Sequence, residues 1–235
     1  MSIKKHIPNF LTLLNLFCGC IAVVSIAEDH FDLAFYFVCL GIFFDFFDGF
    51  LARKFGVAGP LGVQLDSLAD MVTSGVAPGY VMYRLLQETV QGEYSYYVPF
   101  LGFVITLGAC YRLANFNIDT RQSDSFIGLP TPANALFMMS LPMVFESYFH
   151  NLWLLYFANQ WALLAITVLS AYVMNAEIPL FSLKIKDFSF KKYSLQIGFL
   201  ALSILLILLL QILAVPLIIL TYVLLSVVSN MLVKK

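Results

Sequence analysis

The stretch DFFDGFLARKFGVAGPLGVQLDSLAD, residues 45–70, decides how this chain folds. Two pairs of aspartates flank a turn that contains glycine and proline: Asp45 and Asp48 precede the turn, and Asp66 and Asp70 follow it. On a helix, separations of three and four residues place the members of each pair on one face. Because the turn reverses the chain, the sequence predicts a helical hairpin in which all four carboxylates meet at a similar depth.

The composition around this stretch is that of a membrane protein. Of its 235 residues, 61% are hydrophobic and 11% are charged, whereas soluble domains carry about 25% charged residues. A charged side chain inside a membrane segment costs about 2.5–3.5 kcal/mol on insertion scales. Four aspartates together therefore need a bound cation or shared protons, which makes a functional site the default interpretation.

Polar turns divide the chain into eight apolar segments that are long enough, or nearly so, to cross the hydrocarbon core as helices. They lie near residues 8–27, 33–55, 62–87, 96–117, 131–149, 152–175, 194–212 and 215–233. Ala214-Val215-Pro216 predicts a break between the last two, because proline clashes with the preceding turn. We expect an all-α, polytopic transmembrane bundle, with residues 1–235 as one membrane-embedded domain, a motif core at 45–70 and C-terminal helices at 194–233.

Positive charge is distributed unevenly along the predicted spans. If residue 1 is cytoplasmic, 12 of the 13 Lys and Arg residues fall in inner segments, and Arg84 lies near an outer end. This bias predicts that both termini are cytoplasmic. The four aspartates then lie near the cytoplasmic ends of the second and third helices. We expect an integral protein of the bacterial cell membrane that contacts lipid, has no nucleic-acid partner and turns its site to the cytoplasm.

The residues around the aspartates predict a metal-dependent nucleotide site. Facing carboxylates on antiparallel helices supply oxygen ligands, which favour Mg²⁺, Mn²⁺ or Ca²⁺. Gly49 and Ala52 leave a shallow floor beside the first pair, and the Arg53 guanidinium is suited to phosphate oxygens. Together these features indicate a nucleotide diphosphate. The alternative is that Gly49 and Ala52 merely allow close helix packing.

The complete pattern Asp45-x-x-Asp48-Gly49-x-x-Ala52-Arg53, eight residues, Gly62-x-x-x-Asp66-x-x-x-Asp70 resembles the signature of the CDP-alcohol phosphotransferase family. Three further stretches resemble the serine-accepting branch of that family: Pro8-Asn9-x-x-Thr12-x-x-Asn15-Leu16, Arg112-Leu-Ala114-Asn115-Phe116-Asn117 and Gly128-Leu129-Pro130-Thr131-Pro132-Ala133. The resemblance covers about residues 7–190. One position departs from the pattern, because family members more often have a basic residue where Asn115 stands.

The resemblance implies a two-metal reaction. Asp45, Asp48 and Asp66 would bind two divalent cations, Mg²⁺ or Mn²⁺, while Asp70 would contact one metal and act as the catalytic general base. CDP-diacylglycerol and L-serine would be the substrates, and phosphatidylserine and CMP the products. A serine hydroxyl is a poor nucleophile near pH 7, so a base within hydrogen-bond reach has a clear purpose.

Further candidates lie outside the main motif. Thr12 and Asn15 share one face of the first helix, where they would bind the nucleotide and lipid phosphate or brace a motif aspartate. Arg112, Asn117 and Arg121 are candidates for binding the acceptor, because an arginine pairs well with the serine carboxylate. The alternative for the two arginines is that they are ordinary positive-inside anchors.

Two other functions stay open from the sequence alone. Another acceptor, such as glycerol 3-phosphate or an inositol phosphate, would carry a phosphate and call for a more basic pocket. An ion-coupled transporter would also place acidic residues in the membrane, but its site normally lies near the midplane between repeated halves. A homodimer is left open.

Overall fold

The computed structural model describes residues 6–119, 126–147, 158–181 and 194–233. Nearly all of these residues are helical. The main helices are α1 (His6–Ala27), α2 (Phe31–Phe55), α3 (Pro60–Asp70), α4 (Ala77–Thr89), α5 (Val104–Ile118), α6 (Thr131–Ser147), α8 (Gln160–Asn175), α9 (Ser194–Leu210) and α10 (Ala214–Val233). The shorter elements are the π-helical η2 (Met71–Val76), the 3₁₀ segments η3 (Val98–Phe103) and η4 (Gln211–Leu213), and the antiparallel strands β1 (Phe126–Ile127) and β2 (Pro179–Leu180).

Four stretches among the described residues are long and apolar enough to cross a membrane: His6–Ala27, Phe31–Phe55, Val98–Ile118 and Ser194–Leu232. Gln160–Asn175 is a shorter apolar helix. Large apolar side chains point outward along these helices, as 61% of Phe17 and 75% of Leu208 are exposed. An all-helical protein that turns phenylalanine and leucine outward confirms the predicted class of integral membrane protein, while the number of eight spans stays a prediction.

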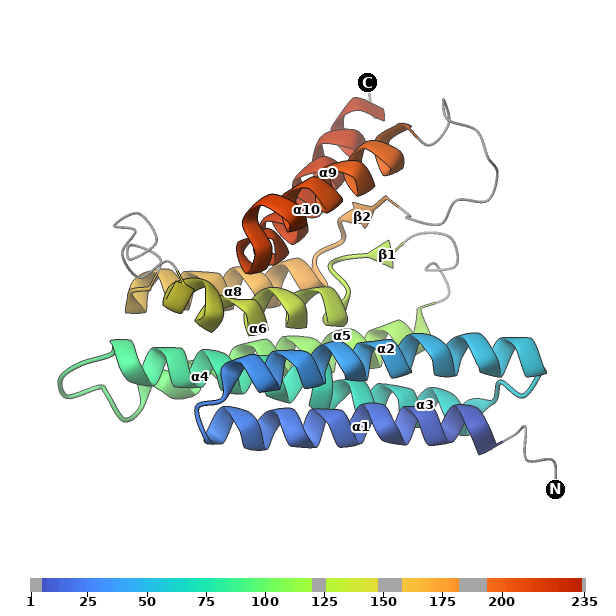
Figure 1. The fold of residues 1–235 in the computed structure, drawn as a ribbon, viewed down its shortest axis with the longest axis horizontal. Coiled ribbons are helices and arrows are strands. Elements are labelled where there is room, and N and C mark those ends of the chain that lie inside the picture. Colours follow the sequence, from blue (N-terminus) through green and yellow to red (C-terminus); the bar gives the residue numbers. More distant parts are fainter. Residues whose placement is uncertain (1–5, 120–125, 148–157, 182–193, 234–235) are drawn as a thin grey trace.

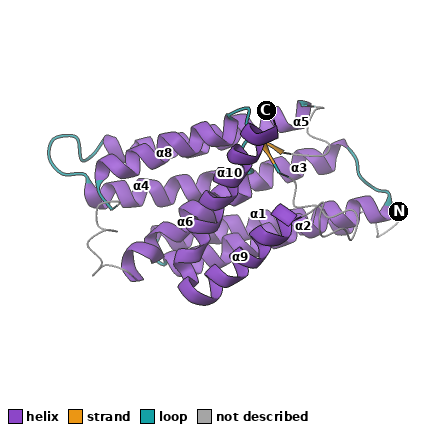
Figure 2. Ribbon diagram, turned by 90° about the horizontal axis from the view of Figure 1, so that it is seen from above, coloured by secondary structure: helices purple, strands orange, loops and turns teal. Residues whose placement is uncertain are grey.

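The helices form a long bundle (Figure 1). Helices α1 to α5 lie along the long axis, α6 and α8 lie beside them, and the hairpin of α9 and α10 is inclined to α1, α2 and α8 in both views (Figure 1, Figure 2). The α2–α3 turn, the end of α5 and the β1–β2 pair lie toward the end of the bundle where the chain begins. The α1–α2 and α4–α5 connections lie toward the opposite end.

The predicted hairpin around residues 56–60 is present, and its local chemistry explains it. Gly56 ends α2 with a φ of 65°, a left-handed conformation that glycine adopts without a steric cost. Its N–H donates to the Arg53 carbonyl at 3.2 Å, and the Val57 N–H donates to the Ala52 carbonyl at 3.0 Å. Pro60 then begins α3, where its missing N–H is no loss.

The run from residue 60 to residue 89 is helical throughout, but its middle part is not α-helical. The π-helical η2 begins at Met71, directly after Asp70, and α4 continues from Ala77. Single π-helical turns within α-helices often occur at functional sites. The sequence predicts the helix at 62–87 but not this change of helical pitch.

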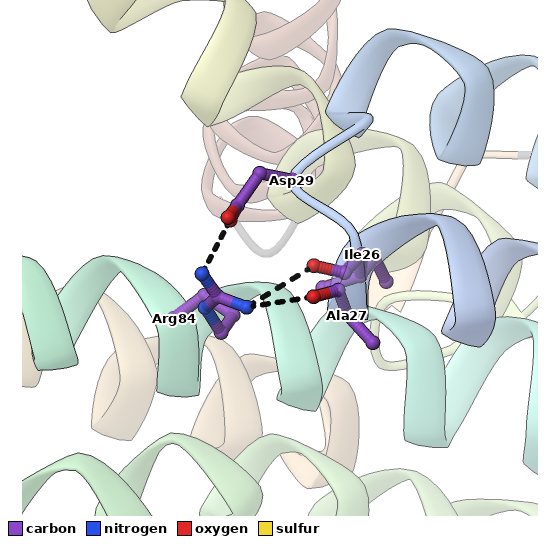
Figure 3. A network of polar contacts seen from close by, with 4 residues as sticks. All are labelled: Ile26, Ala27, Asp29 and Arg84. Atoms are coloured by element: carbon purple, nitrogen blue, oxygen red, sulfur yellow. Dashed lines mark hydrogen bonds and ion pairs between the residues drawn. The ribbon is translucent and has the colours of Figure 1, made fainter.

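Arg84, the exception to the positive-inside pattern, has a structural role in the fold (Figure 3). Its guanidinium donates to the carbonyls of Ala27 at 3.2 Å and Ile26 at 3.5 Å. It also forms an ion pair with Asp29. Arg84 therefore binds the last turn of α1, whose carbonyls lack helical partners, and joins α4 to the α1–α2 connection.

The break between the last two helices differs from the prediction. The chain reverses at Gln211–Leu213, where Gln211 has a φ of 48°. Pro216 lies in the first turn of α10, where it leaves no helical hydrogen bond unmade. The prediction of two separate helices is confirmed, but the placement of the break at Ala214–Pro216 is wrong by about one turn.

Candidate active site

The hairpin of α2 and α3 brings carboxylates from both helices together. Oxygen atoms of Asp45, Asp48 and Asp66 all lie within 4.8 Å of one another. Asp70 lies one turn further along α3 and is buried, as is Asp48. In the described part of the chain, no Lys or Arg forms an ion pair with these four side chains.

This donor set fits a divalent cation. Mg²⁺ binds oxygen ligands at about 2.1 Å and Ca²⁺ at about 2.3–2.6 Å, so oxygens within 4.8 Å of one another can share an ion. All three donors are carboxylates, which suit Mg²⁺ and Mn²⁺ better than Zn²⁺ or Cu²⁺. No Lys or Arg of the described residues forms an ion pair with these carboxylates, so a metal would supply positive charge at this position.

Helix α1 holds two of the aspartates in place. The Thr12 hydroxyl lies 2.5 Å from Asp48 Oδ2, and Asn15 Nδ2 donates to Asp70 Oδ1 at 3.0 Å. Both α1 residues are buried and three positions apart, so they face α2 and α3 together. These contacts agree with the expectation that the two residues brace motif aspartates.

Two pockets adjoin the aspartates. The smaller, of about 180 Å³, lies between α1, α2 and the α2–α3 turn, and Asn9, Thr12 and Ala52 contribute to its wall. The larger, of about 340 Å³, reaches from α2 and α3 to α5 and the start of α6. The residues common to both are Asp48, Gly49, Arg53 and Asp66. The carboxylates therefore lie where the two pockets meet.

Gly49 leaves room for the side chain of Arg53. A Cβ atom at Gly49 would lie 3.3 Å from Arg53 Nη1, closer than most Cβ contacts. The guanidinium therefore folds back over the bare backbone of α2 and faces both pockets. A guanidinium at this position, beside a floor without side chains, has the chemistry to contact phosphate oxygens.

Comparison with known proteins identifies the family of this chain. The family model for CDP-alcohol phosphatidyltransferases matches residues 5–173. This chain belongs to the CDP-alcohol phosphatidyltransferase family. The match covers α1 to α6 and most of α8, and therefore every helix that contributes to the two pockets.

Similar family members come from bacteria and archaea. The chain is 35% identical over 146 residues to the CDP-diacylglycerol–serine O-phosphatidyltransferase of Bacillus subtilis (strain 168), covering 60% of this chain and 78% of that protein. It is 34% identical over 152 residues to the protein of that name from Methanocaldococcus jannaschii, covering 64% and 68%. It is 31% identical over 137 residues to the archaetidylserine synthase of Methanothermobacter thermautotrophicus, covering 57% and 56%.

Two of the candidate acceptor-binding residues have partners within the protein. Arg112 is buried and donates through Nη1 to the carbonyls of Ile127 at 2.6 Å and Met174 at 3.0 Å, while it also borders the larger pocket. Asn117 Nδ2 donates to Ser67 Oγ at 2.8 Å. Arg121 lies outside the described residues.

The structure adds residues that the sequence did not single out for a role. Ser67 and Thr131 border the larger pocket, and Thr73 in η2 donates to the Asn15 carbonyl at 3.1 Å. Thr131 belongs to one of the stretches that resemble the serine-accepting branch, which was the available signal. Ser67 and Thr73 carry no such signal, because a single serine or threonine in an apolar helix is common.

Proposed function

We propose that this chain transfers the phosphatidyl group of CDP-diacylglycerol to L-serine, giving phosphatidylserine and CMP. The observation that carries the proposal is the position of the aspartates between two pockets. A group transfer needs a donor and an acceptor on opposite sides of the reacting phosphorus. The names of the Bacillus subtilis and Methanocaldococcus jannaschii relatives support the same donor and acceptor.

In this proposal Asp45, Asp48 and Asp66, with Asp70, hold two divalent cations, Mg²⁺ or Mn²⁺. When bound, such ions neutralise the pyrophosphate and stabilise charge on the attacking and leaving oxygens. The close approach of the first three carboxylates supports this assignment.

The smaller pocket would hold the nucleotide. Gly49 and Ala52 provide a floor with little side-chain volume, and Arg53 faces the phosphates from the same helix. Thr12 borders this pocket directly, whereas Asn15 reaches the site through Asp70. In our proposal Thr12 and Asn15 therefore contribute to nucleotide and lipid-phosphate binding chiefly by positioning aspartates.

Asp70 would act as the general base. Asn15 Nδ2 binds Asp70 Oδ1, which leaves Oδ2 to accept the proton of the serine hydroxyl. The oxygen then attacks the lipid-side phosphorus, the bond to the CMP oxygen breaks, and CMP leaves with that electron pair. The larger pocket, bordered by Asp70 and Arg112, is the place for the acceptor.

Arg112, Asn117 and Arg121 remain our candidates for binding the acceptor. Arg112 commits Nη1 to two carbonyls, and the rest of its guanidinium is the group that we assign to the serine carboxylate. Arg53 and Arg112 are the two basic residues at the larger pocket within the described structure. A phosphate-bearing acceptor would call for more positive charge.

We further propose that residues 1–235 form one membrane-embedded domain with eight spans and cytoplasmic termini. The active site would face the cytoplasm of a bacterial cell. The 12-to-1 distribution of Lys and Arg supports this orientation. In Figure 1 the α2–α3 turn lies toward one end of the bundle and the α1–α2 and α4–α5 connections toward the other, which agrees with the proposal. We keep a homodimer as an alternative to a monomer.

Release of CMP from CDP-diacylglycerol tests the function directly. The solubilised protein is assayed with L-serine, glycerol 3-phosphate or an inositol phosphate in the presence of Mn²⁺ or Mg²⁺, and Asp66→Ala serves as the inactive control. We expect serine to be preferred by at least about 100-fold, because a site built for one polar acceptor strongly rejects others. Faster CMP release with a phosphate-bearing acceptor would refute serine as the substrate.

A further inference from the structure

Thr73 lies at a point where three helical elements meet behind the active site. It is fully buried in η2, and its hydroxyl donates to the backbone carbonyl of Asn15 in α1 at 3.1 Å. A Cβ atom at Gly19 of α1 would lie 2.5 Å from Thr73 Oγ1, and one at Gly41 of α2 would lie 2.8 Å from Thr73 Cγ2. Thr73 is therefore enclosed by bare backbone on two sides.

The same arrangement fixes the side chain of Asn15. A Cβ atom at Gly41 would also lie 2.8 Å from Asn15 Oδ1, so this oxygen faces the backbone of α2. The opposite amide atom, Nδ2, donates to Asp70. A carboxylate only accepts hydrogen bonds. The contact with Asp70 therefore requires that the Asn15 amide turn its Nδ2, and not its Oδ1, toward the carboxylate.

Asn15 is thus held at its main-chain carbonyl and at its side-chain Nδ2 by the run that contains Asp70. Thr73 binds its main-chain carbonyl, and Asp70 accepts from its side-chain amide. The two partners are three residues apart, and η2 begins between them. A shift of the α1 backbone at Asn15 would therefore disturb both contacts.

We propose that Thr73 is a positioning residue for the transfer reaction: it fixes Asn15, and Asn15 holds the Asp70 carboxyl toward the larger pocket. This inference rests on the proposed role of Asp70 as the general base. Thr73 does not border either pocket, so its effect must pass through Asn15 and Asp70. Loss of an outer hydrogen-bond partner of a catalytic group typically costs about 10–100-fold in activity.

The test is a double-mutant cycle on turnover. Thr73→Val keeps the branched shape but removes the hydroxyl, and it is measured alone and together with Asp70→Asn. We expect Thr73→Val to lower kcat about tenfold or more and to leave KM for CDP-diacylglycerol within about twofold. In the Asp70→Asn background the same change should cost less than about twofold, since coupled residues are not additive. Thr73→Ser should restore most of kcat.

Thr106→Val is the matched control. Thr106 also donates to a carbonyl of η2, that of Gly75, at 2.9 Å, but it has no link to Asn15. We expect Thr106→Val to leave kcat within about twofold. Its small effect should be the same in the Asp70→Asn background, because the two sites are independent. Thermal unfolding of each variant identifies loss of folding, and Thr73→Ala, which is smaller, enters the same cycle if Thr73→Val does not fold.

Equal losses from Thr73→Val in both backgrounds, or a serine variant as impaired as the valine variant, would overturn the positioning role. Full activity of Asp70→Asn by itself would instead refute the general base, and hence that part of the proposed function. The two failures are therefore distinguishable.

Discussion

Asp45, Asp48 and Asp66 supply the three oxygens that lie within 4.8 Å of one another. Replacing any one of them with alanine removes a ligand and leaves two carboxylates to hold the ions. We expect turnover to fall by more than about 10³-fold, since a catalytic metal contributes several kcal/mol of charge stabilisation. CMP release, with and without a chelator, measures this effect.

Asp32→Ala is the control for the proposed metal ligands. Asp32 is an exposed carboxylate in the first turn of α2, the helix that also carries Asp45 and Asp48. It should retain turnover within about twofold, as surface substitutions normally do. Near-normal activity of any ligand variant, or full activity in chelator, would contradict the metal site.

Asp70 allows binding and chemistry to be separated. Asp70→Asn keeps the side-chain volume but cannot take the proton of serine. We expect the rate to fall by about 10²–10⁴-fold, the usual contribution of a general base, while CDP-diacylglycerol still binds. If measured binding fell as steeply as turnover, Asp70 would be a metal ligand only.

The carboxylate cluster could be predicted because its members lie close together in the chain. The spacing of Asp45 and Asp48 and the turn before Asp66 suffice to predict the carboxylate cluster. The contacts of Ser67 and Thr73 join residues 50 and 58 positions apart. Such contacts depend on how each helix is rotated against its neighbour, and the spacing within one helix does not determine that rotation.

At the scale of elements, η3 and α4 pack with their backbones in close approach. A Cβ atom at Gly102 would lie 2.5 Å from the Tyr83 backbone nitrogen and 2.9 Å from the Met82 carbonyl carbon. Gly102→Ala must therefore separate the two elements, which we expect to cost about 1–3 kcal/mol of stability. Thermal unfolding in detergent measures this change.

Gly198→Ala is the matched control for that substitution. Gly198 lies in α9, and nothing lies within 4 Å of a Cβ atom placed there. Alanine should leave stability unchanged or raise it by up to about 1 kcal/mol, because alanine favours helix more than glycine does. A Gly102→Ala protein as stable as Gly198→Ala would show that η3 and α4 are not packed as described.

The boundaries of the elements were predictable where a residue type enforces them. Gly56 and Pro60 end α2 and begin α3, as the sequence indicated. The π-helical η2, which packs against α1 and α5, has no local signal in the sequence that would have predicted it. Pro216 was assigned to a break, although proline is equally suited to the first turn of a helix.

Over the whole molecule, the sequence predicts an orientation in the membrane but not the arrangement of all the helices. The distribution of Lys and Arg predicts which ends of the helices face the cytoplasm, and Arg84 departs from that pattern for a structural reason. It binds the end of α1 and pairs with Asp29, so its charge is already neutralised. No sequence feature predicts the inclination of the α9–α10 hairpin, because these two helices are apolar on nearly all of their faces.

The orientation can be tested by labelling single cysteines in intact cells. The variants are made in a protein whose four native cysteines are replaced. His30→Cys and Glu93→Cys lie in the connections at one end of the bundle, and Ala58→Cys lies in the α2–α3 turn at the other. We expect an impermeant thiol reagent to label positions 30 and 93 from outside, and position 58 only after the cells are opened.

The physical reason for this outcome is the cost of moving positive charge outward. Arg53 and Lys54 end α2 beside position 58, whereas the charged residues nearest to positions 30 and 93 in the sequence are acidic: Glu28, Asp29 and Asp32, and Glu88 and Glu93. Retained CMP release in each variant shows that the helices are still assembled. Labelling of position 58 from outside, with positions 30 and 93 protected, would contradict the predicted orientation and place the aspartates near the outer face of the membrane.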